Sequence, residues 1–425
     1  MFRLLSRAAG LLSVGLLMAQ PAPDAGATAR KALDLLLAEK YPEMEQMFAP
    51  NLKESMKLDG LQKLGAQIKS WGAVENIGAP DVRTAGSTSV VTIAVKFATQ
   101  NISVQMGING AGELSGFFLR PGEIAWQRPA YSKAGSFQER NVVIGENPYK
   151  LPGTLTVPTG PGPFPAVVLV HGTGPNDRDE TVGAVKVFKD LAEGLASRGI
   201  VVLRYEKRTK LFLARMSAKP YTADDETADD AAAAAALLRT VPEVDPKRVY
   251  VLGHSLGGYM GPRIAEQDEK LAGLIILAAN ARPLEDVIVE QASGLDLPAQ
   301  DLAAVKTQAA RVKKLEAADE DQPNVLGLPV AYWVDLKGYD PVALARKLAI
   351  PVLVLQGERD SQVSMKDFAA WKAGVAGLKG ATAKSYPALN HLFVAGEGKS
   401  TEAEYRKPGH VAPEVIDDVA KFMAK

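Results

Sequence analysis

A short apolar run that ends in a Gly-x-Ser-x-Gly sequence constrains the fold of this chain more than any other feature. Residues 247–252 are predicted to form a buried strand, residues 253–257 supply the motif, and helical spacing continues over 258–267. A sharp turn from strand into helix strains the backbone at its central residue, and the flanking glycines leave room where a Cβ would collide with neighbouring elements. Such a turn lifts the hydroxyl of Ser255 above the end of a sheet, which makes Ser255 the candidate nucleophile.

Histidine is the base expected beside such a serine, and the chain contains only four histidines. Where a serine occupies this kind of turn, an acid follows it in the chain and the histidine comes last. This order excludes His171 and His254. His391 lies in a loop directly after a short strand pattern, whereas His410 stands just before the predicted final helix (413–423), where a surface or capping role is expected. We therefore favour His391 as the base.

The acid of the triad is expected at the end of another buried strand. Residues 350–356 form a near-continuous apolar run, which is typical of a strand covered on both faces. Glu358 and Asp360 follow at its carboxyl end. Asp360 is the favoured acid, and its carboxylate would hold the imidazole in the required tautomer. Glu358 is the alternative acid. A third interpretation is that either residue is a solvated loop carboxylate with no catalytic role.

Two backbone amides are candidates for an oxyanion hole. The amide of Leu256 would lie at the positive N-terminal end of the helix after the nucleophile. A second donor is expected from the loop after an earlier strand. The apolar run at 165–170 leads into His171-Gly172-Thr173-Gly174, and the amide of Thr173 is the predicted donor.

A cluster of charged residues at 176–180 follows this loop. Its simplest interpretation is a solvated loop. The alternative is an ion-pair network with Arg204 or Arg208 that stiffens the oxyanion loop.

Composition excludes several classes of function. The 425 residues are 47% hydrophobic, which suffices for one large α/β core and a smaller unit. The absence of cysteine excludes disulfides, thiolate metal sites and cysteine nucleophiles. Basic and acidic residues balance at 49 each, so nothing favours binding to nucleic acid. With four histidines and no phosphate-binding Gly-rich motif, neither a metal centre nor a bound cofactor is expected.

The first nineteen residues have the form of a secretory signal peptide. Arg3 and Arg7 supply positive charge, and the uncharged run at 8–19 is too short to span a bilayer. Cleavage near Ala19 would leave 47 basic residues against 49 acidic ones. The sequence therefore predicts a periplasmic or secreted protein without a membrane span.

Residues 27–120 are predicted to form a small α+β domain. Its strand segments alternate apolar and polar residues, as antiparallel strands with one wet face do. The expected helices are 27–48 and 58–71, and the expected strands are 89–98, 102–108 and 114–119. Residues 121–136 are interpreted as a linker. No titratable cluster occurs in this unit, which favours a packing or oligomerisation role over ligand binding.

From residue 137 to 425, strands alternate with helices, which predicts a mostly parallel sheet with helices on both faces. Residues 141–144 and 153–157 are expected to form an antiparallel hairpin at its edge. The long insertion at 282–347 is predicted to be a helical lid, because structureless loops of this length are rare in compact domains. Within it, Tyr332 and Trp333 are equally consistent with lining an acyl pocket and with anchoring the lid on the core.

Taken together, these segments resemble a known family. HGTGPNDRDET, LASRGIVVLRYEKRTK, GHSLGG, LQGERDSQV and YPALNHLF are similar to segments of bacterial α/β-hydrolases that carry a small N-terminal domain of unknown function and are usually described as secreted esterases. The resemblance covers nearly the whole chain beyond the leader, and it implies a Ser255–Asp360–His391 triad. One position departs from the expected pattern, since Glu206 stands where aspartate is expected.

The function that these features predict is that of a serine hydrolase, a carboxylesterase that cleaves small esters through an acyl-enzyme intermediate. The same residues would serve an acyl thioesterase or a peptidase of the prolyl oligopeptidase type, because the triad sets the reaction and the pocket sets the substrate. A catalytically silent binding protein is the alternative from another class. The expected partner is a small-molecule ester, and the sequence leaves the oligomeric state open.

Overall fold

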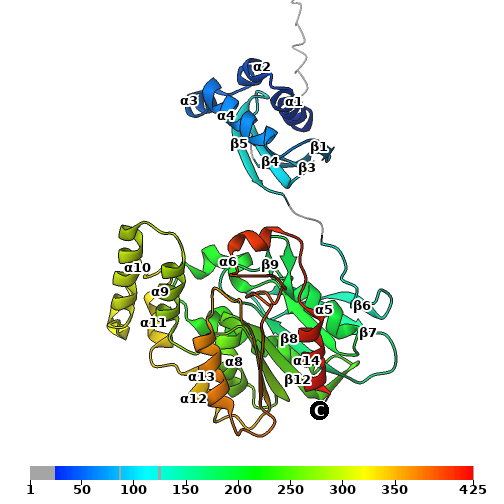
Figure 1. The fold of residues 1–425 in the computed structure, drawn as a ribbon, viewed down its shortest axis with the longest axis vertical. Helices are drawn as coiled ribbons and strands as arrows, with labels where there is room; N and C mark the ends of the chain where they lie inside the picture. The colour runs from blue at the N-terminus through cyan, green and yellow to red at the C-terminus, as the bar shows by residue number, and fades with distance from the viewer. Residues whose placement is uncertain (1–23, 86–87, 123–125, 425) are drawn as a thin grey trace, which may run out of the picture. The chain divides into compact units, whose positions relative to one another are not determined.

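The structure, a computed structural model, describes residues 24–85, 88–122 and 126–424 (Figure 1). The chain divides into two units, Met1–Ile124 and Ala125–Lys425. The predicted signal peptide at 1–19 lies outside the described residues and stays a prediction. No helix within the described ranges has the length and hydropathy needed to cross a membrane.

In its described residues, the first unit combines four helices with an antiparallel sheet. The strand order is β1-β3-β4-β5, and β2 pairs with β3. Along β4, buried residues alternate with half-buried ones, as the period-2 pattern predicts. The elements are α1 (Ala25–Leu37), α2 (Tyr41–Gln46), α3 (Pro50–Ser55), α4 (Leu58–Lys69), β1 (Val74–Ile77), β2 (Asp81–Ala85), β3 (Thr88–Phe97), β4 (Asn101–Ile108) and β5 (Leu114–Pro121).

The single helix expected over 27–48 is wrong, because two helices occupy this range. Glu39, just after α1, has a φ of 59°, in the left-handed region that ends helices. Pro42 then lies in the first turn of α2. Proline is tolerated there because the N–H that it lacks would have no helical partner, but in the interior of one continuous helix it would break a hydrogen bond.

The second unit is built on an eight-stranded sheet. Six strands are parallel, and β7 and β6 add an antiparallel edge, which confirms the predicted hairpin. In spatial order the strands are β15 (Thr382–Tyr386), β14 (Val352–Gly357), β13 (Gly273–Leu277), β12 (Val244–His254), β8 (Phe164–Val170), β11 (Val201–Tyr205), β7 (Leu151–Pro158) and β6 (Phe137–Ile144). A separate short hairpin joins β9 (Thr181–Val182) to β10 (Val185–Lys186).

Helices cover both faces of this sheet (Figure 1). Val168 and Val170 of β8 belong to one apolar core, whereas Val167 and Leu169 belong to the other. This alternation explains why the central strands are apolar throughout. The helices over the first core are α7 (Asp229–Leu238), α8 (Leu256–Gln267) and α13 (Met365–Val375), and those over the second are α5 (Val187–Ala196) and α14 (Pro413–Met423). The predicted fold class is confirmed.

The insertion after β13 is helical. It contains α9 (Leu284–Gly294), α10 (Ala299–Val312), α11 (Val330–Leu336) and α12 (Pro341–Ala345). Tyr332 and Trp333 of α11 are almost fully buried, and the indole N–H of Trp333 donates to the Val325 carbonyl at 2.7 Å. Both side chains therefore anchor the insertion on the core. A further helix that the sequence did not predict, α6 (Arg208–Met216), follows β11.

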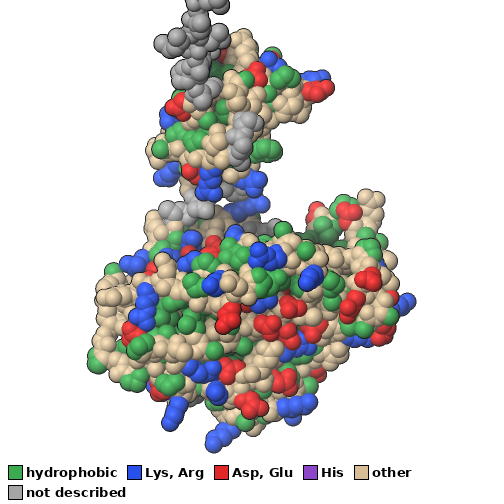
Figure 2. Space-filling view, turned by 180° about the vertical axis from the view of Figure 1, so that it is seen from behind, with side chains coloured by type: hydrophobic (Ala, Val, Ile, Leu, Met, Phe, Trp, Pro, Cys, Tyr) green, Lys and Arg blue, Asp and Glu red, His purple; other side chains and the backbone are tan. Residues whose placement is uncertain are grey.

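Charged side chains of both signs are interspersed on the face of the second unit that Figure 2 shows.

Candidate active site

Ser255 forms the turn between β12 and α8. Its φ of 52° and ψ of −118° are rare for a residue with a Cβ. Its amide donates to the Leu277 carbonyl at 2.9 Å, and its carbonyl accepts from the Tyr259 amide at 2.9 Å. A Cβ on Gly253 would collide with the Gly257 carbonyl, and a Cβ on Gly257 would collide with the Val170 carbonyl. The two glycines of the motif are therefore required by close backbone approach.

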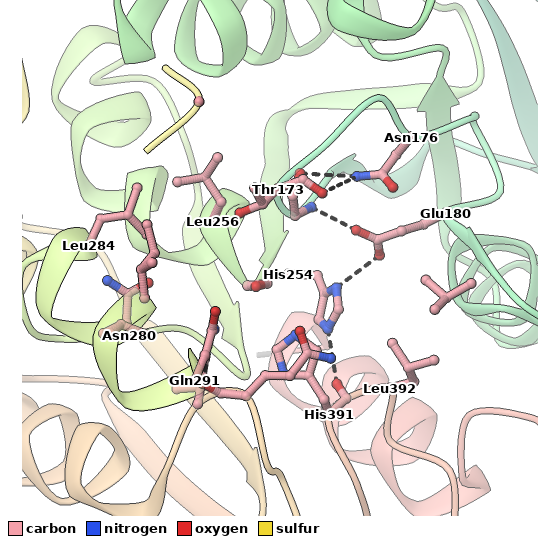
Figure 3. Close-up of a pocket in the computed structure, with 18 of the residues that line it drawn as sticks. Thr173, Asn176, Glu180, His254, Leu256, Asn280, Leu284, Gln291, His391 and Leu392 are labelled. Atoms are coloured by element: carbon pink, nitrogen blue, oxygen red, sulfur yellow. Dashed lines mark hydrogen bonds and ion pairs between the residues drawn. The ribbon is translucent and has the colours of Figure 1, made fainter. Parts of the chain in front are cut away.

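A cavity of about 500 Å³ opens over this turn (Figure 3). Ser255 and His391 both line it, together with Thr173 and Leu256. These residues come from the carboxyl ends of β8, β12 and β15, so the sheet topology gathers them at one edge.

His391 and Asp360 contact each other directly. His391 Nδ1 lies 2.7 Å from Asp360 Oδ2, and both residues are buried. The carboxylate also accepts from the Gln356 side chain at 2.8 Å and from the amides of Gln362 and Val363 at 2.8 and 2.9 Å. These donors orient the carboxylate toward the ring. With Nδ1 engaged, Nε2 is the ring nitrogen that remains for other chemistry.

The alternative acid and base lie in other environments. Glu358 is exposed and accepts from the Ser385 hydroxyl at 2.7 Å. His410 Nδ1 lies 3.1 Å from Asp190 of α5, and neither residue lines the cavity. The structure thus brings Ser255, Asp360 and His391 to one place and leaves the two alternatives outside it.

The amides of Thr173 and Leu256 have no acceptor among the described residues. Hydrogen bonds from several side chains hold the loop that carries Thr173. The Asn176 side chain donates to the carbonyls of Gly172 and Thr173 at 3.1 Å, and Lys207 Nζ donates to the Gly172 carbonyl at 2.7 Å. The Gly172 amide in turn donates to Glu180 at 2.7 Å. This loop is therefore fixed from both sides.

The charged cluster at 176–180 forms ion pairs, so the solvated-loop interpretation is wrong for it. Asp179 accepts from Arg204 at 2.9 Å, which is one of the two pairings that the ion-pair alternative predicted. Arg208 instead pairs with Asp230 of α7. Glu206, the departure from the expected pattern, pairs with Arg178 at 2.8 Å. Glutamate at this position therefore retains an ion pair.

Two buried residues of the site escape sequence-based reasoning. Glu180 is 2% exposed and His254 is 3% exposed, and they lie 3.0 Å apart in an ion pair. Chain order excludes His254 as the base and gives it no other role. Its position directly before Ser255 was the only signal, because its partner is distant in the sequence.

The walls of the cavity are largely apolar. Side chains of α9 form one side, and the turn at 326–328 and Val363 add to it. Asn280, Gln291 and Gln362 add polar groups to those of Thr173, Asn176, Glu180, His254, Ser255 and His391. Figure 3 shows Leu284 and Gln291 of α9 facing the centre of the site. A largely apolar cavity with polar groups in part of its wall suits a small organic ligand.

Comparison with known proteins gives two family matches. The alpha/beta hydrolase family matches residues 167–397, and a family of proteins of unknown function, DUF3887, matches residues 29–117. Esterase EstD of Thermotoga maritima is 36% identical over 394 residues, which cover 92% of this chain and 93% of EstD.

Among solved structures, Est1E of Butyrivibrio proteoclasticus is 17% identical, with a TM-score of 0.46 over 67% of this chain and 99% of its own. A puromycin-hydrolyzing peptidase of Mycobacterium tuberculosis is 18% identical, with a TM-score of 0.47 over 81% of this chain and 47% of its own. The family match over most of the sheet and the EstD relationship over nearly the whole length lead to one conclusion: the chain belongs to the alpha/beta hydrolase family.

Proposed function

We propose that this protein is a serine esterase that cleaves small carboxylic esters through an acyl-enzyme intermediate. The observation that carries the proposal is the arrangement at the β12–α8 turn. Ser255 occupies a strained conformation and lines the same cavity as His391, whose other ring nitrogen is engaged by Asp360 at 2.7 Å. The relationship to EstD, named an esterase, supports the same reaction class.

In the acylation step, His391 Nε2 accepts the proton of the Ser255 hydroxyl as Oγ attacks the ester carbonyl carbon. The Asp360 carboxylate stabilises the imidazolium that forms and does not itself take the proton. As the tetrahedral intermediate collapses, the imidazolium returns this proton to the leaving alcohol oxygen. The alcohol departs and the acyl group remains on Ser255.

The amides of Thr173 and Leu256 would donate to the oxyanion of the tetrahedral intermediate. Both line the cavity, and neither is engaged by an acceptor in the described part of the chain. Donors fixed in advance are effective because they need no reorganisation as charge develops. The contacts of Asn176 and Lys207 with the loop support such fixation.

In the deacylation step, a water molecule gives a proton to His391 Nε2 and attacks the acyl carbon. The second tetrahedral intermediate then releases the carboxylic acid, and the proton returns to Ser255 Oγ. The apolar wall from α9 would receive the apolar part of the substrate, which favours small esters over charged ones in a cavity of about 500 Å³.

Substitution of the serine tests this proposal. With 4-nitrophenyl esters of increasing acyl length, Ser255→Ala is expected to lower kcat by about 10³- to 10⁶-fold, the range typical of triad removal. The fold should persist, because the hydroxyl has no hydrogen-bond partner among the described side chains. Ser293→Ala on the exposed side of α9 is the matched control and should retain full activity. More than about one percent of wild-type kcat in folded Ser255→Ala would overturn the assignment.

A further inference from the structure

A buried carboxylate and a buried imidazole line the same cavity as the proposed nucleophile. Glu180 Oε1 accepts from the Gly172 amide at 2.7 Å, and Glu180 Oε2 lies 3.0 Å from His254 Nδ1. No aligned hydrogen bond joins these two atoms, so the contact is an ion pair when the ring is protonated. Glu180 is thus shared between the oxyanion loop and His254.

The other nitrogen of the His254 ring is also engaged. His254 Nε2 lies 3.0 Å from the backbone carbonyl oxygen of His391, and the two rings are tilted against each other with centroids 4.8 Å apart. A carbonyl oxygen can only accept, and so can an ionised carboxylate. Both ring nitrogens of His254 therefore need a hydrogen, which makes the ring an imidazolium that balances the buried charge of Glu180.

The surrounding charges agree with this assignment. Burial disfavours a charge on His254, but Glu180 and, more weakly, Asp360 raise the pKa of His254 above its ordinary value. Burial likewise opposes ionisation of Glu180, yet the attraction of His254 lowers the pKa of Glu180. Lys207, which lies between β11 and α6, pairs with Glu226 at 2.8 Å. Burial lowers the pKa of His171 to about 4, so His171 is neutral and does not compete for Glu180.

We propose that Glu180 and His254 form a positioning pair that fixes the oxyanion loop and the His391 loop relative to Ser255. Figure 3 shows the connection, which runs from the Gly172 amide through Glu180 and His254 to the backbone of His391. The proposal rests on the proposed function of Ser255 and His391. Neither member of the pair contacts the reacting atoms, so each acts through the groups it holds.

Neutralising Glu180 should weaken the coupling between the two loops. In Glu180→Gln the amide oxygen can still accept from Gly172, but the counter-charge of His254 is lost. The side-chain NH2 takes the place of Oε2 and can donate to Nδ1 of a neutral His254. The ion pair thus becomes a contact between neutral groups, which holds the two loops less firmly. We expect kcat to fall roughly 10- to 100-fold with KM little changed, because a shift of about 1 Å in catalytic groups costs up to 10²-fold and acts mainly in the transition state.

The test combines kinetics with the charge state of His254 in the full-length protein. Asp190→Asn, which alters the corresponding acid–imidazole contact with His410 outside the cavity, is the matched control and should leave kcat unchanged. In ¹⁵N-histidine-labelled protein, NMR should show two protonated ring nitrogens on His254 at pH 7.5, where an unperturbed histidine is neutral. In Glu180→Gln this signal should become that of a neutral ring.

Two results would contradict the proposal that Glu180 and His254 act as a positioning pair. One is a neutral His254 in the wild-type protein at pH 7.5, and the other is the same kcat in Glu180→Gln as in Asp190→Asn. The NMR measurement needs no catalysis and also decides the question if a variant folds poorly. Ser255→Ala should leave the His254 signal intact while it abolishes hydrolysis. Failure of the proposed nucleophile is therefore distinguishable from failure of the positioning pair.

Discussion

Ser255 adopts a backbone conformation that costs about 1–3 kcal/mol for a residue other than glycine. Its neighbours hold it there through the backbone hydrogen bonds to Leu277 and Tyr259. A strained residue with an unpartnered hydroxyl at the end of a central strand contributes little to stability. Its conformation is better explained by the position that it gives to Oγ.

His171 should make the stability of the protein sensitive to acid. Burial lowers its pKa to about 4, while its Nε2 contacts the Asp177 carbonyl at 3.1 Å. His171 takes up a proton near pH 6.5 in the unfolded chain but only near pH 4 in the folded chain. The contribution of neutral His171 to the free energy of unfolding is therefore complete above about pH 6.5 and is lost as pH falls toward 4. The free energy of unfolding should fall by up to about 3 kcal/mol, because each unit of difference in pKa corresponds to about 1.4 kcal/mol.

The measurement is urea unfolding of the wild type and of His171→Gln between pH 4 and 7.5. Glutamine is uncharged, and its amide can donate to the Asp177 carbonyl. The difference in the free energy of unfolding between the two proteins should shrink as pH falls. A difference that stays constant over this range would show that His171 is not held neutral.

Most of the candidate site could be predicted at the level of single residues. Ser255 and Asp360 follow the buried strands β12 and β14, and His391 follows the edge strand β15. Parallel strands bring their carboxyl ends to one edge. The pairing of Glu180 with His254 could not be predicted in this way. Glu180 lies in a run of five polar and charged residues, and only tertiary packing decides which of them turns inward and which remain at the surface.

At the scale of elements, the close contact between α8 and β8 depends on Gly257. A Cβ there would meet the carbonyls of Val170 and His171, which are backbone atoms and cannot move aside. At Gly261, one turn further along α8, a Cβ would meet only the end of the Leu274 side chain at 3.0 Å. Glycine is therefore required at 257 by close backbone approach, whereas at 261 only a flexible side chain limits the space.

We expect Gly257→Ala to lower the free energy of unfolding by at least about 2 kcal/mol, the cost of overpacking against a rigid neighbour. Gly261→Ala should change it by less, because alanine favours the helix by about 1 kcal/mol and the leucine can adjust. Chemical denaturation of both variants measures the difference. An equal decrease in the free energy of unfolding in both variants would contradict the proposed role of Gly257 in the α8–β8 contact.

Long elements were predicted better than short ones. The buried strands and the final helix have strong patterns of their own. By contrast, β1 is a four-residue segment whose first three residues are exposed, and it becomes a strand only by pairing with β3. The break between α1 and α2 could have been predicted from Pro42, but the periodic apolar pattern across it favoured one helix.

At the scale of the whole molecule, each unit has an apolar core of its own. Every residue that lines the candidate site belongs to the second unit. The first unit matches a family of unknown function, and its predicted role in packing or oligomerisation stays a prediction. The central claim thus concerns one cavity of the second unit, with Ser255 as its nucleophile and His391 as its base.

Covalent labelling with a fluorophosphonate tests this claim most directly. Peptide mapping by mass spectrometry should place a single adduct on Ser255, and Ser255→Ala should remain unlabelled. The labelling rate should fall by orders of magnitude in His391→Ala and stay near the wild-type value in His410→Ala, because only a base beside the serine activates it. An adduct on another residue while ester hydrolysis persists, or loss of labelling in His410→Ala alone, would contradict the account.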